Sequence, residues 1–363
     1  MQSKNGKVLK KRAKSVAIPG PQSAHRDVSK FRLRRTASEG SVTYLSWLRR
    51  GSVHLLKLGY VKIVNWTWKA VSFSSLPSWM QDNEFLQENN RPPMYSFRGS
   101  LKSMFRLHTE TWHIWSHFLG FLFWLALSLK LWVIGGDPTV VLKGIQVHDL
   151  PWVQQALLLL FFVCVMAGFF FSFVFHLFSN HSKRMYLFFS RLDYSGITFM
   201  TTGSFVPFYY YGLYCSPVSL YIHITIQCIL SAICLSITFW NKFGTPKYRT
   251  LRFTVFILFG FYAVIPSVQI ILQDGLQYAR HAYSILGIVT AAMFAVLGAV
   301  VYVLRVPERF FHGKVITIWF NSHHIWHICC FVVSLIIFNS ILDMMKYRRD
   351  VGGCTEIMGN IEI

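Results

Sequence analysis

Charged residues are scarce in this chain. Only 14% of its 363 residues are Asp, Glu, Lys or Arg, whereas 53% are hydrophobic and 17% are aromatic. Soluble domains carry about 25% charged residues, and one aqueous core does not bury this many large side chains. The composition therefore excludes an ordinary soluble protein and favours a protein that folds in a lipid bilayer.

Acidic residues are the scarcest charged type, at 15 against 36 Lys and Arg, which gives a net charge of +21. Such an excess is typical of nucleic-acid-binding proteins when the basic residues share one surface. Here 20 of the 36 basic residues lie in residues 1–110, ahead of the apolar body of the chain. The N-terminus also lacks the apolar run and cleavage site of a secretory signal peptide. We therefore expect a basic cytoplasmic tail on a membrane domain, and no nucleic-acid partner.

Long apolar runs follow the tail, and seven of them approach the roughly 20 residues that cross a hydrocarbon core as a helix. They lie at about 114–134, 152–178, 186–213, 219–240, 253–272, 282–304 and 316–340. The predicted fold class is an all-α membrane protein, a seven-transmembrane helix bundle. Pro207 and Pro266 lie inside the third and fifth runs, where proline kinks a helix.

The predicted segments of the chain follow from these runs. They are a basic, largely disordered tail (1–75), a cytoplasmic juxtamembrane segment (76–113), the seven-helix domain (114–342) and a short extracellular tail (343–363). Apolar residues 55–64, together with Trp66, Trp68 and Trp79, suggest an interfacial helix or a helix packed on the bundle. Residues 32–38 resemble a basophilic kinase site, a string that is common in basic tails.

Lys and Arg are distributed unevenly between the predicted loops. The loops after the second, fourth and sixth spans, with their helix edges, carry ten of them, and the other three loops carry two. Because cytoplasmic loops are enriched in Lys and Arg, the N-terminus is predicted inside and the C-terminus outside. Cys215 and Cys354 then fall on the oxidising side, where we expect a disulfide between them.

Several classes of seven-helix protein lack support in the sequence. The predicted orientation is inverted relative to G-protein-coupled receptors, and the Asp-Arg-Tyr and Asn-Pro-x-x-Tyr motifs of those receptors are missing. The seventh span has no Lys for a retinal Schiff base. No charged residue lies near the predicted midplane, which argues against a transporter. The seven cysteines contain no C-x-x-C spacing of the zinc-binding kind.

Ionisable residues inside the spans are few, and four of them fall at the predicted cytoplasmic helix ends: His176, Asp193, His323 and His327. His323 and His327 are four residues apart and share a helix face, as do Ser172 and His176. Three imidazoles that meet between helices can hold Zn²⁺ with its fourth position open for water. Asp193 could then act as general acid or base, and Ser172 could hold the water.

The H-x-x-x-H spacing alone has a high chance frequency in a chain with 14 His. His113 and His117 repeat it near the same membrane face, so they are either a rival pair or a source of a further ligand. A membrane His also hydrogen-bonds a neighbouring helix about as often as it binds a metal. We interpret His223, His281 and His312 as ordinary histidines at membrane edges or in loops.

Several motifs between about residues 75 and 356 resemble those of the adiponectin receptors, which belong to the progestin and adipoQ receptor family. The motifs are Asp82-Asn-Glu-Phe-Leu86, Asn90-Arg-Pro-Pro-Met-Tyr-Ser-Phe-Arg98, Phe105-Arg-Leu-His-Thr-Glu-Thr111, Phe175-His176, Leu192-Asp-Tyr-Ser-Gly196, Gly203-Ser-Phe-Val-Pro207, Tyr214-Cys-Ser-Pro217, Thr245-Pro-Lys247, Arg305-Val-Pro-Glu-Arg-Phe-Phe311, Trp319-Phe-Asn-Ser-His323 with His327, and Gly352-Gly-Cys-Thr355. One departure is Glu110-Thr-Trp-His113, where the family usually has Glu-Thr-Gly-Asn.

The resemblance implies an inverted seven-helix receptor of the plasma membrane with a buried zinc ion and a ceramidase activity. It places the zinc ligands on His176, His323 and His327 and the supporting residues on Ser172 and Asp193. The partners it implies are an adiponectin-like extracellular ligand or a membrane lipid, a ceramide-type substrate, cytoplasmic adaptor proteins and a second copy of the chain. The competing interpretation is a non-enzymatic receptor or membrane-fluidity sensor whose zinc is structural.

Overall fold

The computed structural model describes residues 69–134, 146–240, 242–311, 313, 315–352 and 354. The chain divides into two units, Met1–Gly59 and Tyr60–Ile363. All described residues belong to the second unit. The string 32–38 and the suggested interfacial helix at 55–64, with Trp66 and Trp68, lie outside the described residues.

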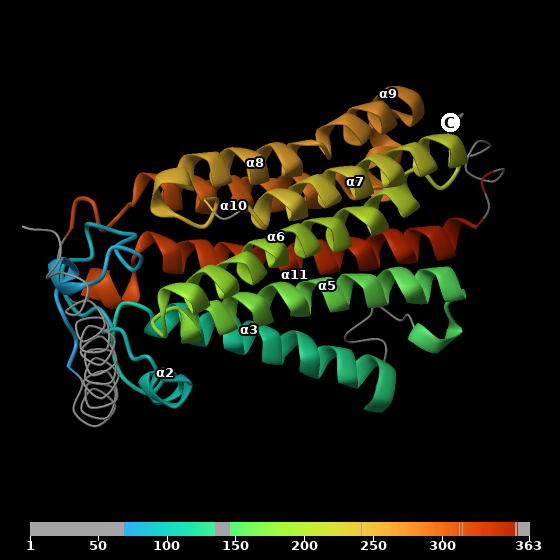
Figure 1. Cartoon of the computed structure of the whole chain (residues 1–363). Helices are drawn as coiled ribbons and strands as arrows, with labels where there is room; N and C mark the ends of the chain where they lie inside the picture. Colours follow the sequence, from blue (N-terminus) through green and yellow to red (C-terminus); the bar gives the residue numbers. More distant parts are fainter. Residues whose placement is uncertain are drawn as a thin grey trace, which may run out of the picture. The chain divides into compact units, whose positions relative to one another are not determined.

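Most of the described chain after residue 96 forms α-helices (Figure 1). They are α2 (Phe97–Ser103), α3 (Thr111–Leu129), α5 (Trp152–Phe178), α6 (Lys183–Gly212), α7 (Pro217–Thr238), α8 (Arg249–Phe261), α9 (Val264–His281), α10 (Ile285–Leu304) and α11 (Ser322–Val351). Among the described residues, β pairing is limited to an isolated bridge between Val71 and Asn90. The predicted all-α fold is confirmed.

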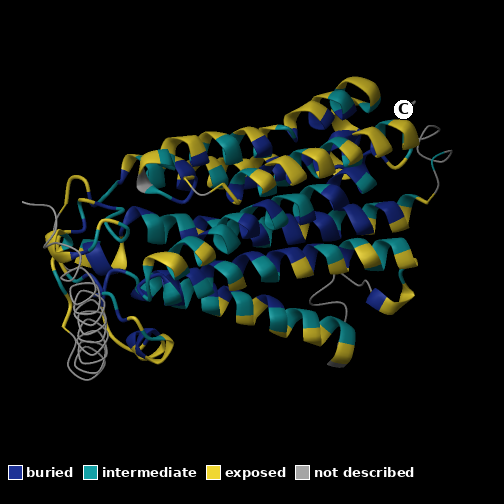
Figure 2. Ribbon diagram, viewed as in Figure 1, coloured by how far each residue is buried: buried dark blue, intermediate teal, exposed yellow. Residues whose placement is uncertain are grey.

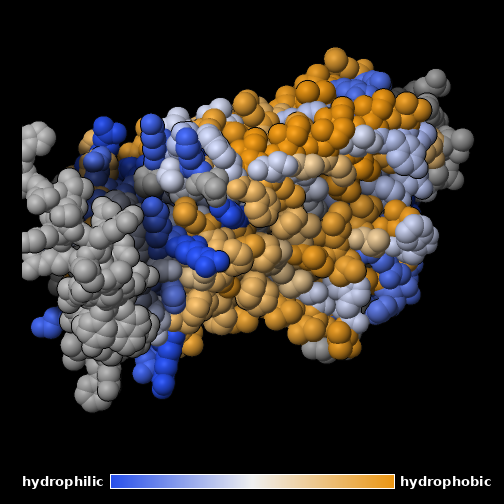
Figure 3. All heavy atoms as spheres, in the orientation of Figure 1, coloured by the Kyte–Doolittle hydropathy of each residue, from blue (hydrophilic) through white to orange (hydrophobic). Residues whose placement is uncertain are grey.

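Six helical segments of the described chain are long and apolar enough to cross a membrane. They are Thr111–Val133, Trp152–Phe178, Pro217–Thr238, Arg249–His281, Ile285–Leu304 and Val315–Val351. The remaining predicted span, the third at 186–213, corresponds in position to α6, which has 30 residues and packs against α5 and α7. At 1.5 Å per residue this length exceeds a hydrocarbon core of about 30 Å. Figure 3 shows an apolar band over the helices, with hydrophilic side chains at both ends.

The predicted kink at Pro266 is a break between two helices. α8 ends at Phe261 and α9 begins at Val264. The ring of a proline inside a helix clashes with the carbonyl four residues earlier, which here belongs to Tyr262. The Tyr262 carbonyl instead accepts from the Ile265 N–H, at 3.0 Å. Pro207 lies inside α6, which continues to Gly212.

Helix α11 differs in its bounds from the predicted span 316–340. Residues Val315–Trp319 form a separate π-helical turn, and α11 begins at Ser322 and continues to Val351. The start is set by capping, because the Asn321 side chain accepts the His324 N–H at 3.0 Å. The helix therefore also includes the first residues of the predicted extracellular tail.

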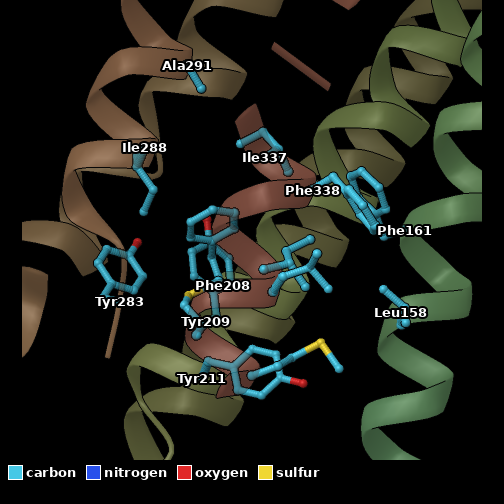
Figure 4. Packing of buried hydrophobic residues seen from close by; sticks show 14 of the residues in the cluster. Leu158, Phe161, Phe208, Tyr209, Tyr211, Tyr283, Ile288, Ala291, Ile337 and Phe338 are labelled. Carbon is cyan, nitrogen blue, oxygen red and sulfur yellow. The ribbon is translucent and has the colours of Figure 1, made fainter. Parts of the chain in front are cut away.

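The main hydrophobic core lies between α3, α5, α6, α9, α10 and α11, where the buried residues concentrate (Figure 2). Its aromatic side chains interlock edge to face: the Trp124 ring is 5.5 Å from Phe161 and 5.4 Å from Phe338, between centroids. Tyr209, Tyr211 and Tyr283 continue the core (Figure 4). Figure 1 places the ends of α6 and α11 on the same side of the bundle. We call this side the disulfide end, since Cys215 and Cys354 are bonded there as predicted.

The opposite end, where α5 ends and α3, α6 and α11 begin, is called the histidine end. Helices α5 and α6 approach closely next to it, at Gly168 and Gly196. A Cβ atom on Gly196 would lie only 3.0 Å from the Gly168 Cα. Small residues allow such close packing of membrane helices. The contact sets Ser172, one turn along α5, opposite Asp193, one turn back along α6.

An ion pair and a hydrogen bond join the juxtamembrane segment to the loop between α10 and α11. The Arg305 guanidinium donates to the Asp82 carboxylate at 2.9 Å, and the Asn83 amide donates to the Glu308 carboxylate at 3.0 Å. Glu308 is fully buried, and it accepts the Ser322 N–H at 2.7 Å. The loop thereby caps the start of α11, the helix that carries two of the predicted ligands.

Candidate metal centre

Five imidazoles gather at the histidine end. They come from three helices: the start of α3, the end of α5 and the first two turns of α11. The residues are His113, His117, His176, His323 and His327. Ring centroids of neighbouring members are 3.6 to 5.3 Å apart. The pair His113 and His117 and the pair His323 and His327 therefore lie in the same cluster and are not rival sites in different places.

His176, His323 and His327 offer one ring nitrogen each within 4.8 Å of one another. His176 and His327 are buried and His323 is partly buried. The geometry matches the predicted ligand set, whose metal-binding role stays a prediction.

The hydrogen bonds of two rings leave a nitrogen for a metal. The Nδ1 atom of His176 is 2.7 Å from a Glu110 carboxylate oxygen, and its Nε2 atom is buried without a hydrogen-bond partner among the described residues. The Nδ1 atom of His327 is 3.0 Å from the Ser116 hydroxyl. Metal-binding histidines usually make such a bond with the second nitrogen, which orients the ring. A buried imidazole nitrogen without a partner is costly, so a metal fits the residues present.

Glu110 is the N-cap residue of α3, and its carboxylate contacts two imidazoles. One oxygen lies 2.7 Å from His176 Nδ1 and 3.3 Å from His113 Nδ1. Burial raises the pKa of this carboxyl group, but His113 and His176 outweigh burial and hold the pKa well below its usual value. Glu110 is therefore an anion at neutral pH and supplies the negative charge next to the cluster.

Ser172 and Asp193 meet across the α5–α6 contact. The Ser172 side chain lies beside the Asp193 carboxylate, and Asp193 interacts electrostatically with His176. Ser172 is buried and Asp193 is partly buried. An acidic group and a hydroxyl thus lie beside the imidazoles, on the side of the cluster formed by α6.

His324, His223 and His281 have hydrogen-bond or stacking partners outside the cluster. His324 turns away, as its position on the helix predicts, and its Nδ1 atom is 2.5 Å from the Trp319 carbonyl. Both ring nitrogens of His223 are bonded, to Tyr262 and Gln269, and the His281 ring stacks on Tyr347. This agrees with an ordinary structural role for His223 and His281. His312 lies outside the described residues.

Four residues that support the site were not singled out from the sequence. Asn321 and Glu308 cap α11, Ser116 orients His327, and Arg91 binds the end of α5 beside His176. Three of them, all except Ser116, lie in the quoted family motifs. The contacts of Ser116 with His327 and of Arg91 with His176 join residues more than 80 positions apart, which spacing does not reveal.

A family model described as haemolysin-III related matches residues 105–338, which include the whole histidine end from Glu110 to His327. The chain belongs to this family. Related proteins include the adiponectin receptor protein of Drosophila melanogaster, 36% identical over 294 residues, with 81% of this chain and 64% of that protein covered. Progestin and adipoQ receptor-like protein 1 of Caenorhabditis elegans is 33% identical, with 77% of this chain and 62% of that protein covered.

A human relative, progestin and adipoQ receptor family member 3, is 28% identical over 306 residues, with 82% of this chain and 94% of that protein covered. The resemblance inferred from the motifs is therefore confirmed. This haemolysin-III-related chain spans a little under two thirds of the length of the fly and worm relatives. Figure 1 places its family-matched region on the helices α3 to α11.

Proposed function

We propose that this chain is a receptor of the adiponectin-receptor type whose histidine end holds Zn²⁺ and hydrolyses a lipid amide of the ceramide class. The observation that carries the proposal is the convergence of His176, His323 and His327 within 4.8 Å. The unpartnered Nε2 atom of His176 supports it. Three histidines with an open fourth position are a ligand set of catalytic zinc.

The chemistry of the proposed reaction divides between the ion and the chain. Zinc in such a site lowers the pKa of bound water to about 7 and polarises a carbonyl group. Asp193 would take the proton of the attacking water and deliver it to the leaving amide nitrogen. Ser172, which lies beside Asp193, would hold that carboxylate in place. A site at one end of the bundle suits an amphiphile whose amide lies near the headgroups.

The proposed orientation places the histidine end at the cytoplasmic face of the plasma membrane and the C-terminus outside. The distribution of Lys and Arg supports it. The disulfide between Cys215 and Cys354 supports it independently, because disulfides persist in oxidising compartments. An extracellular ligand of the adiponectin kind or a lipid would then act from the disulfide end, and adaptor proteins from the histidine end.

A receptor or fluidity sensor with a structural zinc is the second candidate. The burial of the ligands favours it, since His176 and His327 are only 2% and 1% exposed. Structural zinc sites are closed, with four ligands, and the additional imidazoles of His113 and His117 lie close by. Such an ion would fasten α5 to α11 and need no substrate.

Metal content and lipid turnover separate these possibilities. In detergent-purified protein, we expect this ligand set to hold about one zinc ion per chain. His176→Ala should lose this zinc, and the zinc content of His327→Ala should fall by about one ion per chain. The control variant His324→Ala should keep the wild-type zinc content. The ceramidase proposal further expects release of sphingosine from ceramide, abolished in Asp193→Asn with zinc retained. Zinc without turnover would favour the structural role. Wild-type protein without zinc, after purification without chelators, would overturn both.

A further inference from the structure

A second group of potential metal ligands lies beside the three-histidine set. It consists of Glu110, His113 and His176, whose ligand atoms are also all within 4.8 Å of one another. His113 and His176 are buried, and Glu110 is partly buried. Two imidazoles and one carboxylate are a common donor set for Zn²⁺ and other divalent transition metals. Only His176 belongs to both groups.

Asn321 determines which nitrogen of His113 carries a proton. Its Nδ2 atom donates to the Thr317 carbonyl at 3.0 Å, and its Oδ1 atom accepts the His324 N–H at 3.0 Å. The oxygen therefore faces His113 Nε2, which is 3.0 Å away. An amide oxygen only accepts hydrogen bonds, so Nε2 of His113 must donate. In the neutral ring the Nδ1 atom then carries a lone pair and no proton.

That lone pair faces a second acceptor. The Nδ1 atom of His113 lies 3.3 Å from the Glu110 carboxylate oxygen. With zinc-to-ligand bonds of about 2.0–2.2 Å, two ligands of a tetrahedral ion are roughly 3.3 Å apart. The spacing between the two acceptors is therefore the one that a shared cation requires. The same carboxylate oxygen lies 2.7 Å from Nδ1 of His176. This hydrogen-bond distance lengthens by about 0.6 Å when the two atoms bind one ion, and His176 then completes the set.

We propose that Glu110, His113 and His176 form a second site for a divalent transition metal of the zinc type. This site shares only His176 with the three-histidine site. When both sites are filled, His176 uses Nδ1 for one ion and Nε2 for the other, and its ring proton leaves to the solvent. The site depends on His113, which stands where the family usually has Asn, so it is a property of this chain rather than of the family pattern.

The test measures zinc bound to the detergent-purified full chain over a series of free zinc concentrations. Wild type is expected to reach about two ions per chain and His113→Asn about one. Asparagine can still donate to Asn321, so this variant preserves the local hydrogen bond. His324→Asn is the matched control and keeps both ions. Monodisperse gel filtration and an unchanged helical circular-dichroism spectrum confirm that each variant folds.

Two further variants keep this inference separate from the proposed function. His327→Ala removes a ligand of the first site only, and about one His113-dependent ion should remain. Glu110→Gln removes a ligand of the second site only, and about one His327-dependent ion should remain. Absorption of bound Co²⁺ gives a second readout, with two spectral components in wild type and one in His113→Asn. Equal zinc content in wild type and His113→Asn would overturn the inference and point to a protonated His113 paired with Glu110.

Discussion

The guanidinium of Arg91 lies against the last turn of α5 and donates to the backbone carbonyl of His176. It also donates to the Leu177 carbonyl, at 3.1 Å, and to the hydroxyls of Ser103 and Ser179. A helix C-terminus leaves its carbonyls without partners, and a cation there satisfies them and complements the helix dipole. A side chain from the juxtamembrane segment thus fixes the turn that presents a proposed zinc ligand.

Replacing Arg91 with Met should destabilise the protein by roughly 2–4 kcal/mol, because buried acceptors lose their donor. The thermal unfolding midpoint in detergent should fall, together with zinc content. Burial, partly offset by Glu110, lowers the pKa of Arg91 to about 10, so the side chain is still charged at neutral pH. The control is Arg98→Met, since Arg98 is exposed on α2. Equal midpoints for the two variants would contradict the capping role.

Two glycine substitutions should have opposite effects, because Gly196 lies at the close contact of α5 with α6 and Gly260 lies in open space. Gly196→Ala places a Cβ atom 3.0 Å from Gly168 Cα, where backbone must move, and should cost about 1–3 kcal/mol. Gly260→Ala in α8 meets no atom within 4 Å and should stabilise by about 0.5–1 kcal/mol. Thermal unfolding of both variants provides the measurement. A stabilising Gly196→Ala would show that the helices separate freely there.

The sequence predicted the number and approximate position of the membrane helices, because a hydrocarbon core requires about 20 apolar residues per pass. It also predicted which residues share a face, since His323 and His327 are four apart on one helix. The start of α11 was misplaced because apolar residues 316–320 continue the run without a break. Only the cap at Asn321 and Ser322, completed by Glu308, fixes the helix start.

The sequence left the relation between the two histidine pairs open. Spacing shows that His113 and His117 share a face of α3, but it does not show which helices that face contacts. The structure stacks His117 on His327 and places Glu110 between His113 and His176. The sequence also could not predict that Arg91 and Glu308 are buried, because each is surrounded by segments distant in the chain.

The ion pair between Asp82 and Arg305 should make part of the stability depend on pH. Burial raises the pKa of Asp82, but Arg305 together with Arg249 and Arg252 outweighs burial, and the pKa lies below its ordinary value. This contribution is therefore fully present above about pH 4 and is lost as the pH falls through the lowered pKa. Asp82→Asn should cost about 1–2 kcal/mol at pH 7.

Thermal unfolding at pH 7 and at about pH 3 tests the sign of this effect. The difference between wild type and Asp82→Asn should shrink at the lower pH, as the wild-type carboxylate becomes protonated. Glu84→Gln is the control, because Glu84 is an exposed acid two residues away. A difference that grows on acidification would refute the ion pair as the source of stability.

The bond between Cys215 and Cys354 joins the α6–α7 turn to the chain beyond α11, across 139 residues of sequence. Replacing both with Ser should lower stability by roughly 2–4 kcal/mol, because the denatured chain gains freedom. Cys228→Ser, at an exposed free cysteine, is the control.

The same bond tests the orientation in the membrane. On intact cells, a membrane-impermeant maleimide should label wild type only after an impermeant reductant opens the bond. Because the proposed orientation puts both cysteines outside, labelling that needs permeabilised cells would reverse it and move the histidine end to the other face.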